Sequence, residues 1–213
     1  GIRRDVEYIA NRAAGELGVA PEVIFFIEPE GYLVTRYIDG THITPEEMGQ
    51  PHNIRRVAEK LRTFHTHAPK LANEFNVFRR IEMLTRTSRE HHCRFPNNFD
   101  WIVERVRQVE TALNRDPYTP RPCHDDLLNL NFLDAHGEIY ILDWEYAGMG
   151  DIFFDLANFS SHHRFNDDQV HELLRAYFGE ATAQRFACLK LMWAMSEIHE
   201  AMWGTTQTGI SKL

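Results

Sequence analysis

The stretch from Pro122 to Phe159 constrains the fold of this chain more than any other part of the sequence. Two short apolar runs in it predict neighbouring strands, and residues 134–137 between them have the composition of a hairpin turn. A hairpin places the start of its first strand beside the end of its second, so we expect Asn131 and Asp143 to lie side by side. A carboxylate and an amide oxygen that converge on one point can hold a hard cation such as Mg²⁺.

Four polar residues in this stretch follow a specific order: His124, Asp126, Asn131 and then Asp143 at the end of a strand. This order resembles the catalytic loop and metal-binding Asp of the protein-kinase-like phosphotransferases. No Arg follows the His, and Trp-Glu-Tyr stands where protein kinases have Phe-Gly. The stretch therefore looks like the choline/ethanolamine kinase and aminoglycoside phosphotransferase branch, and within it like the bacterial choline kinases. The alternative is that each Asp only caps a turn.

The resemblance implies a role for each of these residues in phosphoryl transfer from ATP. Asp126 would orient the acceptor hydroxyl and take its proton. His124 would belong to the same catalytic loop, where we expect it to orient the loop rather than act as the base. Asn131 and Asp143 would hold Mg²⁺ against the nucleotide phosphates. Asp155 would bond the backbone of the loop, although its place just inside a helix also suits a charge favoured by the helix dipole.

The N-terminal part of the chain resembles the back half of a kinase small lobe. Apolar spacing predicts a helix over residues 5–17, followed by strands at 23–26 and 32–35. We expect a partial N-terminal nucleotide lobe and hinge at residues 1–39, and a C-terminal catalytic and substrate-binding lobe at residues 40–213. The expected fold class is α+β, a protein-kinase-like two-lobed fold with an incomplete small lobe and a mostly helical large lobe.

The resemblance assigns nucleotide binding in the small lobe to Glu7, which would pair with a strand lysine. It also assigns it to the backbone of Arg36, Tyr37 and Ile38, which would face the adenine. The alternative for Glu7 is a solvated helix charge. The family's phosphate-covering loop and strand lysine belong upstream of this helix, and the sequence starts at Gly1 without them. We therefore expect either part of a longer protein or a chain without the lysine that grips the α- and β-phosphates.

In most of the remaining sequence, apolar residues recur at the three- and four-residue spacing of helices. Thr44 and Pro45 mark a helix start. Further helices are predicted at 54–68, 78–92, 100–113, 169–178 and 181–203, with caps at Asp100 and at Asp167 and Asp168. Within these helices we expect Trp101 to face the core, and His65 and His67 to lie on the surface.

Two aromatic residues and one acid suggest the acceptor. Tyr146 follows the metal-binding Asp by three residues, and Trp203 is predicted at the end of the last helix, one turn after Glu200. The resemblance makes the aromatic pair candidate walls for a quaternary ammonium, worth roughly 0.5–2 kcal/mol per cation–π contact, and Glu200 an anionic wall. The alternative for Trp203 is packing in the core. Eukaryotic relatives place a second Trp near here and this chain does not, so ethanolamine or another amino alcohol stays open.

Composition narrows the classes of partner. With 23 Lys+Arg and 31 Asp+Glu, the net charge of −8 makes non-specific nucleic-acid binding a poor match. No apolar run is long enough for membrane insertion. The three cysteines form no Cys-x-x-Cys pair, which favours a reducing, cytoplasmic location. No His or Cys spacing supports a zinc site. The sequence does not fix the oligomeric state.

Three interpretations follow. The leading one is an ATP- and Mg²⁺-dependent kinase that phosphorylates the small amino alcohol choline. The second is an ethanolamine, thiamine, homoserine or aminoglycoside kinase on the same scaffold. The third is a truncated, non-catalytic kinase-like binding module. The lysine that the sequence lacks favours this third interpretation, whereas the presence of Asp126, Asn131 and Asp143 argues against it.

Overall fold

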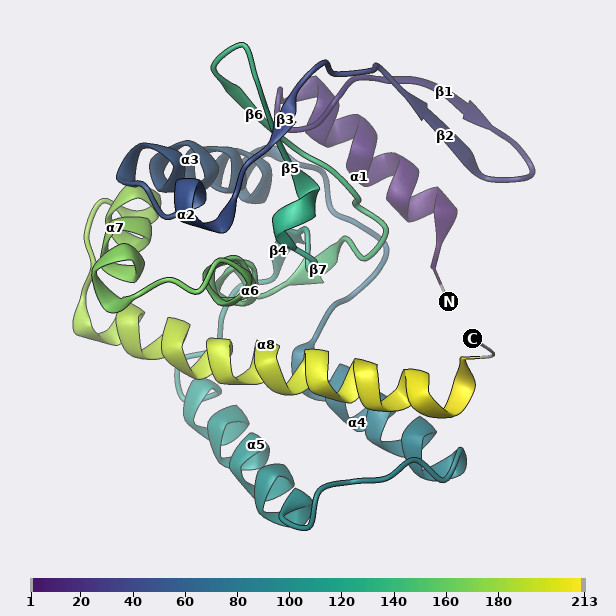
Figure 1. The fold of residues 1–213 in the computed structure, drawn as a ribbon, viewed down its shortest axis with the longest axis vertical. Coiled ribbons are helices and arrows are strands. Elements are labelled where there is room, and N and C mark those ends of the chain that lie inside the picture. The colour runs from purple at the N-terminus through teal and green to yellow at the C-terminus, as the bar shows by residue number, and fades with distance from the viewer. Residues whose placement is uncertain (1, 212–213) are drawn as a thin grey trace.

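The computed structural model of the protein describes residues 2–211 and has the mixed α and β composition expected from the sequence (Figure 1). The helices are α1 (Arg4–Glu16), α2 (Pro45–Met48), α3 (Pro51–His67), α4 (Val77–Glu90), α5 (Phe99–Leu113), α6 (Ile152–His162), α7 (Asp167–Phe178), α8 (Ala183–Ile210) and the short 3-10 turn η1 (Asn129–Asn131). The strands are β1 (Val23–Ile27), β2 (Tyr32–Thr35), β3 (Thr41–His42), β4 (Arg121–Cys123), β5 (Phe132–Ala135), β6 (Glu138–Ile141) and β7 (Gly148–Gly150).

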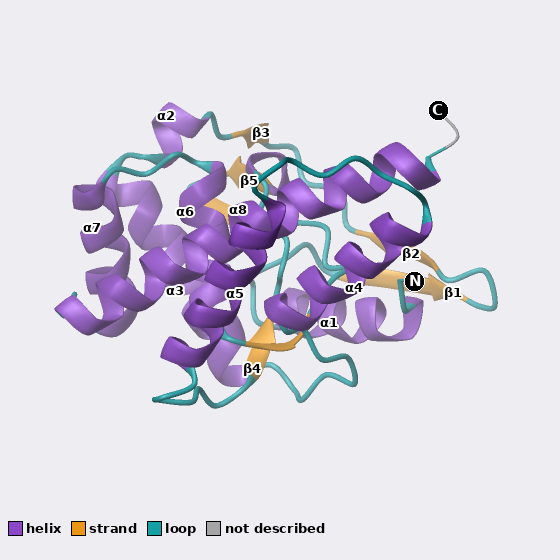
Figure 2. Cartoon of the chain, turned by 90° about the horizontal axis from the view of Figure 1, so that it is seen from below, coloured by secondary structure: helices purple, strands orange, loops and turns teal. Residues whose placement is uncertain are grey.

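A small N-terminal unit consists of α1 and the antiparallel β1–β2 hairpin. It lies at one end of the molecule, and α7 lies at the other (Figure 2). The ring of Tyr8 on α1 stacks on Phe26 of β1 at a centroid distance of 4.6 Å. Ile9 is exposed, because Val6, Asn11 and three alanines form the buried face of α1. The chain then enters the sheet of the larger unit through β3, which pairs with β5.

The long helix α8 forms the base of the larger unit. It packs against α6 and α4, while α3 packs against α7 (Figure 1). Beneath these helices, the fully buried Trp144 meets Phe64 of α3 at a ring-centroid distance of 4.3 Å. This aromatic contact joins the helical layer to the segment that follows β6. No helix within residues 2–211 combines the length and the apolar character that crossing a membrane requires.

The hairpin expected from the sequence is formed by β5 and β6. Its register pairs Phe132 with Ile141, and its turn uses His136 and Gly137, whose φ values of 54° and 83° are left-handed. The N–H of Leu142 donates to the carbonyl of Asn131 at 2.8 Å, so Asn131 lies beside the residue that precedes Asp143, as the hairpin predicted. Residues 129–131 form the turn η1 rather than a strand. The Asn131 side chain donates to the carbonyl of Asp126, which curls the chain before β5 begins.

Three details of the helices differ from the sequence prediction. Trp101 is 60% exposed, because α5 lies at the outside of the helical layer and buries only a narrow stripe. Asn98, rather than Asp100, precedes α5, and Asn166, rather than the acidic pair after it, caps α7. Helix α8 continues to Ile210, so Trp203 lies within it and not at its end.

The cap of α7 provides a test of local stability. Asn166 and Gln169 form a reciprocal capping box, in which the side chain of each accepts from the backbone N–H of the other. We expect Asn166→Ala to lower the free energy of unfolding by about 1 kcal/mol, measured by urea denaturation. Asn166→Asp should retain most of the stability, because Asp caps a helix equally well. Equal losses in both variants would contradict a capping role.

Candidate active site

The loop from His124 to Asn131 is held in place by the buried carboxylate of Asp155. Its two oxygens accept the backbone N–H groups of His124 and Asp125, each at 2.8 Å. Asp125 has a φ of 67°, a left-handed conformation that an Asp tolerates better than most residues. Asp155 lies in the first turn of α6, where the helix dipole also favours its charge. The contact is therefore of the kind that the resemblance implied for Asp155.

His65 completes the support of this carboxylate, and its position corrects the prediction that it lies on a helix surface. It is buried, its Nε2 donates to Asp155 Oδ2 at 2.9 Å, and its Nδ1 accepts from the hydroxyl of Tyr177 at 2.7 Å. Burial opposes ionisation, yet the hydrogen bonds from His65 and from the His124 N–H hold the pKa of Asp155 below its ordinary value. Asp155 therefore keeps its negative charge although it is buried.

Cys123 joins His65 and Asp155 in a buried cluster whose possible ligand atoms lie within 4.8 Å of one another. Both nitrogens of His65 are already used in hydrogen bonds. Burial raises the pKa of the Cys123 thiol, which therefore stays protonated. A metal needs deprotonated ligands with free lone pairs, and this cluster offers too few of them. It is a hydrogen-bonded support for the loop.

His124 has both ring nitrogens engaged with the backbone. Its Nε2 donates to the carbonyl of Leu142 at 2.8 Å, and its Nδ1 accepts the N–H of Asp126 at 3.2 Å. The ring also packs edge-on against Trp144, and burial lowers the pKa of the imidazole. His124 therefore joins the loop to the segment after β6, which fits a positioning role and not that of a base.

The donor set at Asn131 and Asp143 fits a magnesium ion. Asn131 uses its Nδ2 to bond the loop, and within the described part of the chain its Oδ1 has no hydrogen-bond partner. Asp143 is exposed at the end of the hairpin, and within residues 2–211 its carboxylate forms no hydrogen bond or ion pair. Mg²⁺ prefers one or two protein oxygens of this kind and completes its coordination with phosphate and water. These two residues are the ones that would hold it.

The residues expected to contact nucleotide lie on the small unit. Glu7 pairs with Arg4 at 2.5 Å, and Arg4 also reaches Glu145 at 3.6 Å, so the Glu7 side chain is directed toward the end of the hairpin that carries Asp143. Arg36 is exposed and bonds Glu22. Tyr37 and Ile38, with Arg36, form the connection between β2 and β3. Arg4 thus links Glu7 to Glu145, two residues after Asp143, and residues 36–38 lie in the connection between β2 and β3.

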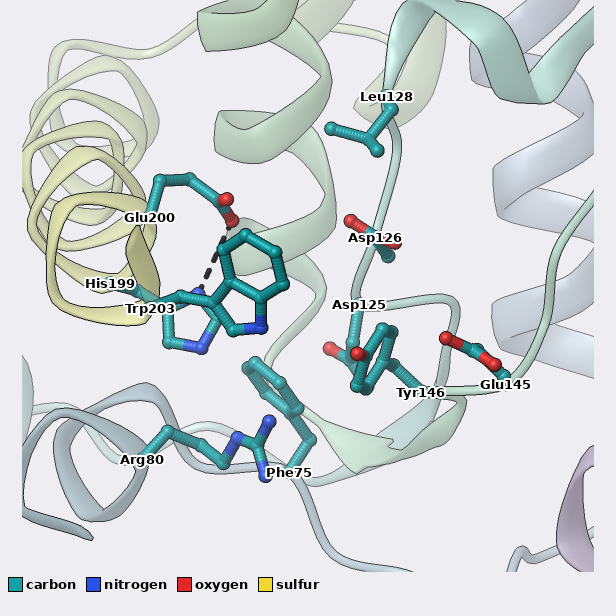
Figure 3. Close-up of a pocket in the computed structure, with 10 residues that line it drawn as sticks. All are labelled: Phe75, Arg80, Asp125, Asp126, Leu128, Glu145, Tyr146, His199, Glu200 and Trp203. Carbon is teal, nitrogen blue, oxygen red and sulfur yellow. Dashed lines mark hydrogen bonds and ion pairs between the residues drawn. The ribbon is translucent and has the colours of Figure 1, made fainter. Parts of the chain in front are cut away.

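Asp126 borders a cavity of about 230 Å³ between the loop, α4 and α8. Figure 3 shows Glu200 and Trp203 of α8 on one side of this cavity and Asp126 and Tyr146 on the other. The candidate acceptor residues are therefore brought together. Trp203 is 44% exposed, which excludes complete burial in the core.

Six other residues that the sequence did not single out also line this cavity: Phe75, Arg80, Asp125, Leu128, Glu145 and His199. His199 could have been found, because a helix places it on the same side as Trp203, four residues on. Phe75 lies just before α4 and Arg80 in its first turn, and both are far from the loop in sequence, so no local pattern identifies them.

Acidic groups crowd the cavity and change the chemistry of Asp126. Burial raises the pKa of Asp126 to about 7, and the nearby charges of Glu200, Asp143 and Glu145 add to the effect. A carboxylate with this pKa is a better proton acceptor near neutral pH than an ordinary Asp. A bound cation would offset the repulsion between these carboxylates, so the site is suited to a cationic ligand.

The raised pKa predicts a stability gain for Asp126→Asn. Ionising Asp126 in the folded state is unfavourable, so the penalty is absent below the unfolded pKa near 4, grows as the pH rises, and is complete above about 7. We expect the variant to be more stable by about 1–3 kcal/mol at pH 8 and nearly equal at pH 4, by urea denaturation. The exposed Asp168→Asn should show no such difference. A variant less stable than the parent at pH 8 would refute the electrostatic explanation.

Comparison with known proteins gives a family match over most of the chain. The model of the phosphotransferase enzyme family matches residues 6–187. Over 152 residues the chain is 27% identical to the LicA homolog of Metamycoplasma hominis, an alignment that covers 71% of this chain and 59% of that protein. The chain thus spans less than two thirds of the length of this relative.

Two solved structures show the same fold. A choline/ethanolamine kinase family protein from Mesorhizobium loti superposes with a TM-score of 0.90 and 33% identity, covering 98% of this chain and 73% of that one. Choline kinase LicA from Streptococcus pneumoniae superposes with a TM-score of 0.83 and 22% identity, covering 100% of this chain and 75% of that one. The likeness confirms the kinase-like α+β fold. The chain therefore belongs to the phosphotransferase enzyme family, in its choline/ethanolamine kinase branch.

Proposed function

We propose that the protein transfers the γ-phosphate of ATP to the hydroxyl of a small amino alcohol, with choline as the acceptor that its relatives indicate and phosphocholine as the product. One observation carries the proposal. Asp126 stands at the boundary between an acidic and aromatic cavity and the loop that carries Asn131, so one carboxylate can face both an acceptor and a nucleotide.

In the proposed reaction, Asp126 accepts a hydrogen bond from the acceptor hydroxyl and orients its oxygen toward the γ-phosphorus. The new P–O bond forms as the bond to the β-phosphate oxygen breaks, the proton passes to Asp126, and ADP leaves. Asn131 and Asp143 would hold Mg²⁺, which offsets charge on the phosphate oxygens. Glu7 and residues 36–38 would face the nucleotide from the small unit.

The size and lining of the cavity favour a small cationic acceptor. At about 230 Å³ it is below the roughly 300–1,000 Å³ of sites for drug-sized ligands, which disfavours a multi-ring aminoglycoside. Tyr146 and Trp203 offer aromatic faces, and Glu200 offers negative charge. Although burial opposes it, the hydrogen bond from His199 holds the pKa of Glu200 below its ordinary value, so Glu200 remains an anionic wall. Choline and ethanolamine both fit these features. The proposed location is the cytoplasm, where ATP would be supplied to the reaction.

The proposal is tested by assaying the full-length protein with Mg²⁺ and ATP against choline, ethanolamine and kanamycin. We expect turnover of an amino alcohol and none of kanamycin. Asp126→Ala should lower kcat by at least about 10³-fold with the fold retained, because both the orientation and the proton acceptor are lost. Asp168→Asn serves as an exposed control with unchanged activity. Turnover of kanamycin alone would refute the proposal, and binding without any turnover would favour the non-catalytic module.

The pH profile is a separate test of the role of Asp126. The base must be ionised, so kcat/KM should fall as the pH drops below the pKa of about 7 that burial gives this carboxyl in the free protein. In kcat the limb should lie at a lower pH, because a bound cationic acceptor stabilises the carboxylate. Initial rates between pH 5 and 9 measure both limbs. An acidic limb near pH 4 in kcat/KM would contradict this role.

A further inference from the structure

Helix α6 holds the loop that carries Asp126 with two buried side chains, Asp155 and Asn158. Asp155 accepts the backbone N–H groups just before Asp126. Asn158 lies one turn later on the same side of α6, and its Oδ1 accepts the N–H of Leu127 at 2.6 Å. Both side chains have an exposed fraction of 0%. The backbone is therefore fixed on both sides of the residue expected to accept the proton.

The amide of Asn158 also reaches α8. Its Nδ2 donates to the hydroxyl of Ser196 at 3.0 Å, and Ser196 is fully buried. Helix α6 lies between the loop and α8, and it packs closely against α8 (Figure 1). A carboxamide has both an acceptor and donors, so it joins a backbone N–H to a hydroxyl without burying a charge. Within residues 2–211, no other side chain forms hydrogen bonds to both the loop and α8.

Ser196 lies on the side of α8 that faces the cavity. Glu200 and Trp203 follow it at the four- and seven-residue spacing of one helix face, and both line the cavity. A helix is rigid over two turns, so a displacement at Ser196 also displaces these two side chains. The hydrogen bonds of Asn158 therefore hold the α8 side of the cavity at a fixed distance from Asp126.

A buried hydroxyl can also serve the core alone, and Ser160 of α6 shows such a case. It is as fully buried as Ser196, but its hydroxyl donates to the carbonyl of Leu156 in its own helix at 2.7 Å. That bond joins no two elements. The contacts of Asn158 and Ser196 differ, because they run from the loop through α6 to α8. Ser160 is therefore a matched control for Ser196 in residue type and burial.

We propose that Asn158 and Ser196 are positioning residues, which set the distance between the α8 side of the cavity and Asp126 and so make the site selective for the chain length of its acceptor. The inference rests on the proposed function and adds two residues to it. An acceptor whose charged end lies against Glu200 and Trp203 brings its hydroxyl to Asp126 only if its length matches this distance. A misplacement of about 1 Å can lower a reaction rate about 10²-fold.

The test compares two acceptors of different length with the full-length protein, Mg²⁺ and ATP. They are the better acceptor of choline and ethanolamine, and its homologue with one more methylene between nitrogen and hydroxyl. We expect the parent to favour the shorter acceptor by at least about tenfold in kcat/KM. Ser196→Ala removes the partner of the Asn158 Nδ2 and should reduce this preference at least about threefold, through a lower kcat for the shorter acceptor and an unchanged KM for ATP.

Ser160→Ala should leave the preference of the parent unchanged. The ratio between two acceptors, measured on one sample, does not depend on how much of the protein is folded. A variant that is only destabilised would therefore keep the ratio of the parent, whereas a lost positioning contact changes it.

Amide hydrogen exchange, followed by NMR, tests the link between the loop and α8 without turnover. The N–H of Leu127 should exchange at least about tenfold faster in Ser196→Ala than in the parent, and at the parent rate in Ser160→Ala. Exchange at the parent rate in a folded Ser196→Ala would overturn the inference.

The outcomes also separate the inference from the proposed function. A parent that uses both acceptor lengths equally well overturns the inference while kinase activity stands, and this result does not depend on whether any variant folds. An unchanged preference in Ser196→Ala has the same meaning. No turnover of either acceptor, with the expected exchange rates, would refute the kinase and support the positioning link.

Discussion

The site depends on one buried carboxylate. Asp155 accepts hydrogen bonds from His65 and from the backbone of His124 and Asp125. Without these bonds, two N–H groups of the loop would be buried and unpaired, and the left-handed turn at Asp125 would lose its support. The loop directs Asp126 toward the cavity only because its backbone is fixed here. Tyr177 of α7 in turn bonds His65 of α3. The packing of α3 against α7 therefore helps to fix the geometry of the loop, although the loop lies in neither helix.

The acidic residues that line the cavity lower the stability of the fold but suit the proposed function. Asp125, Asp126, Glu145 and Glu200 line one small space. Burial and mutual repulsion raise the pKa of Asp126 and of Glu145. A fold under selection for stability alone would not collect these charges. In the proposed function, a cation in the cavity would offset these charges, and Asp126 would accept a proton near neutral pH.

Local patterns predicted the parts of the site that are built locally. The β5–β6 hairpin, the loop from His124 to Asn131 and the side of α8 that carries Trp203 all follow from residues close in sequence. Tertiary contacts decided the rest. The helical pattern predicts His65 at the surface, because this local pattern does not include its partner, the Asp155 carboxylate 90 residues away in sequence. Arg80 comes from α4, and its place over Tyr146 depends on how two segments meet in space.

A buried amide joins α8, which carries Glu200 and Trp203, to the loop that carries Asp126. Asn158 of α6 accepts the N–H of Leu127 at 2.6 Å and donates to Ser196 of α8 at 3.0 Å. Ser196 lies less than one turn before His199, so a shift of α8 by a ligand on Trp203 would act directly on the backbone next to Asp126. Because buried hydrogen bonds resist such shifts, the spacing between α8 and the loop that carries Asp126 is held nearly constant. In the proposed reaction, this rigidity would make the length of the acceptor, and not only its charge, a condition for turnover.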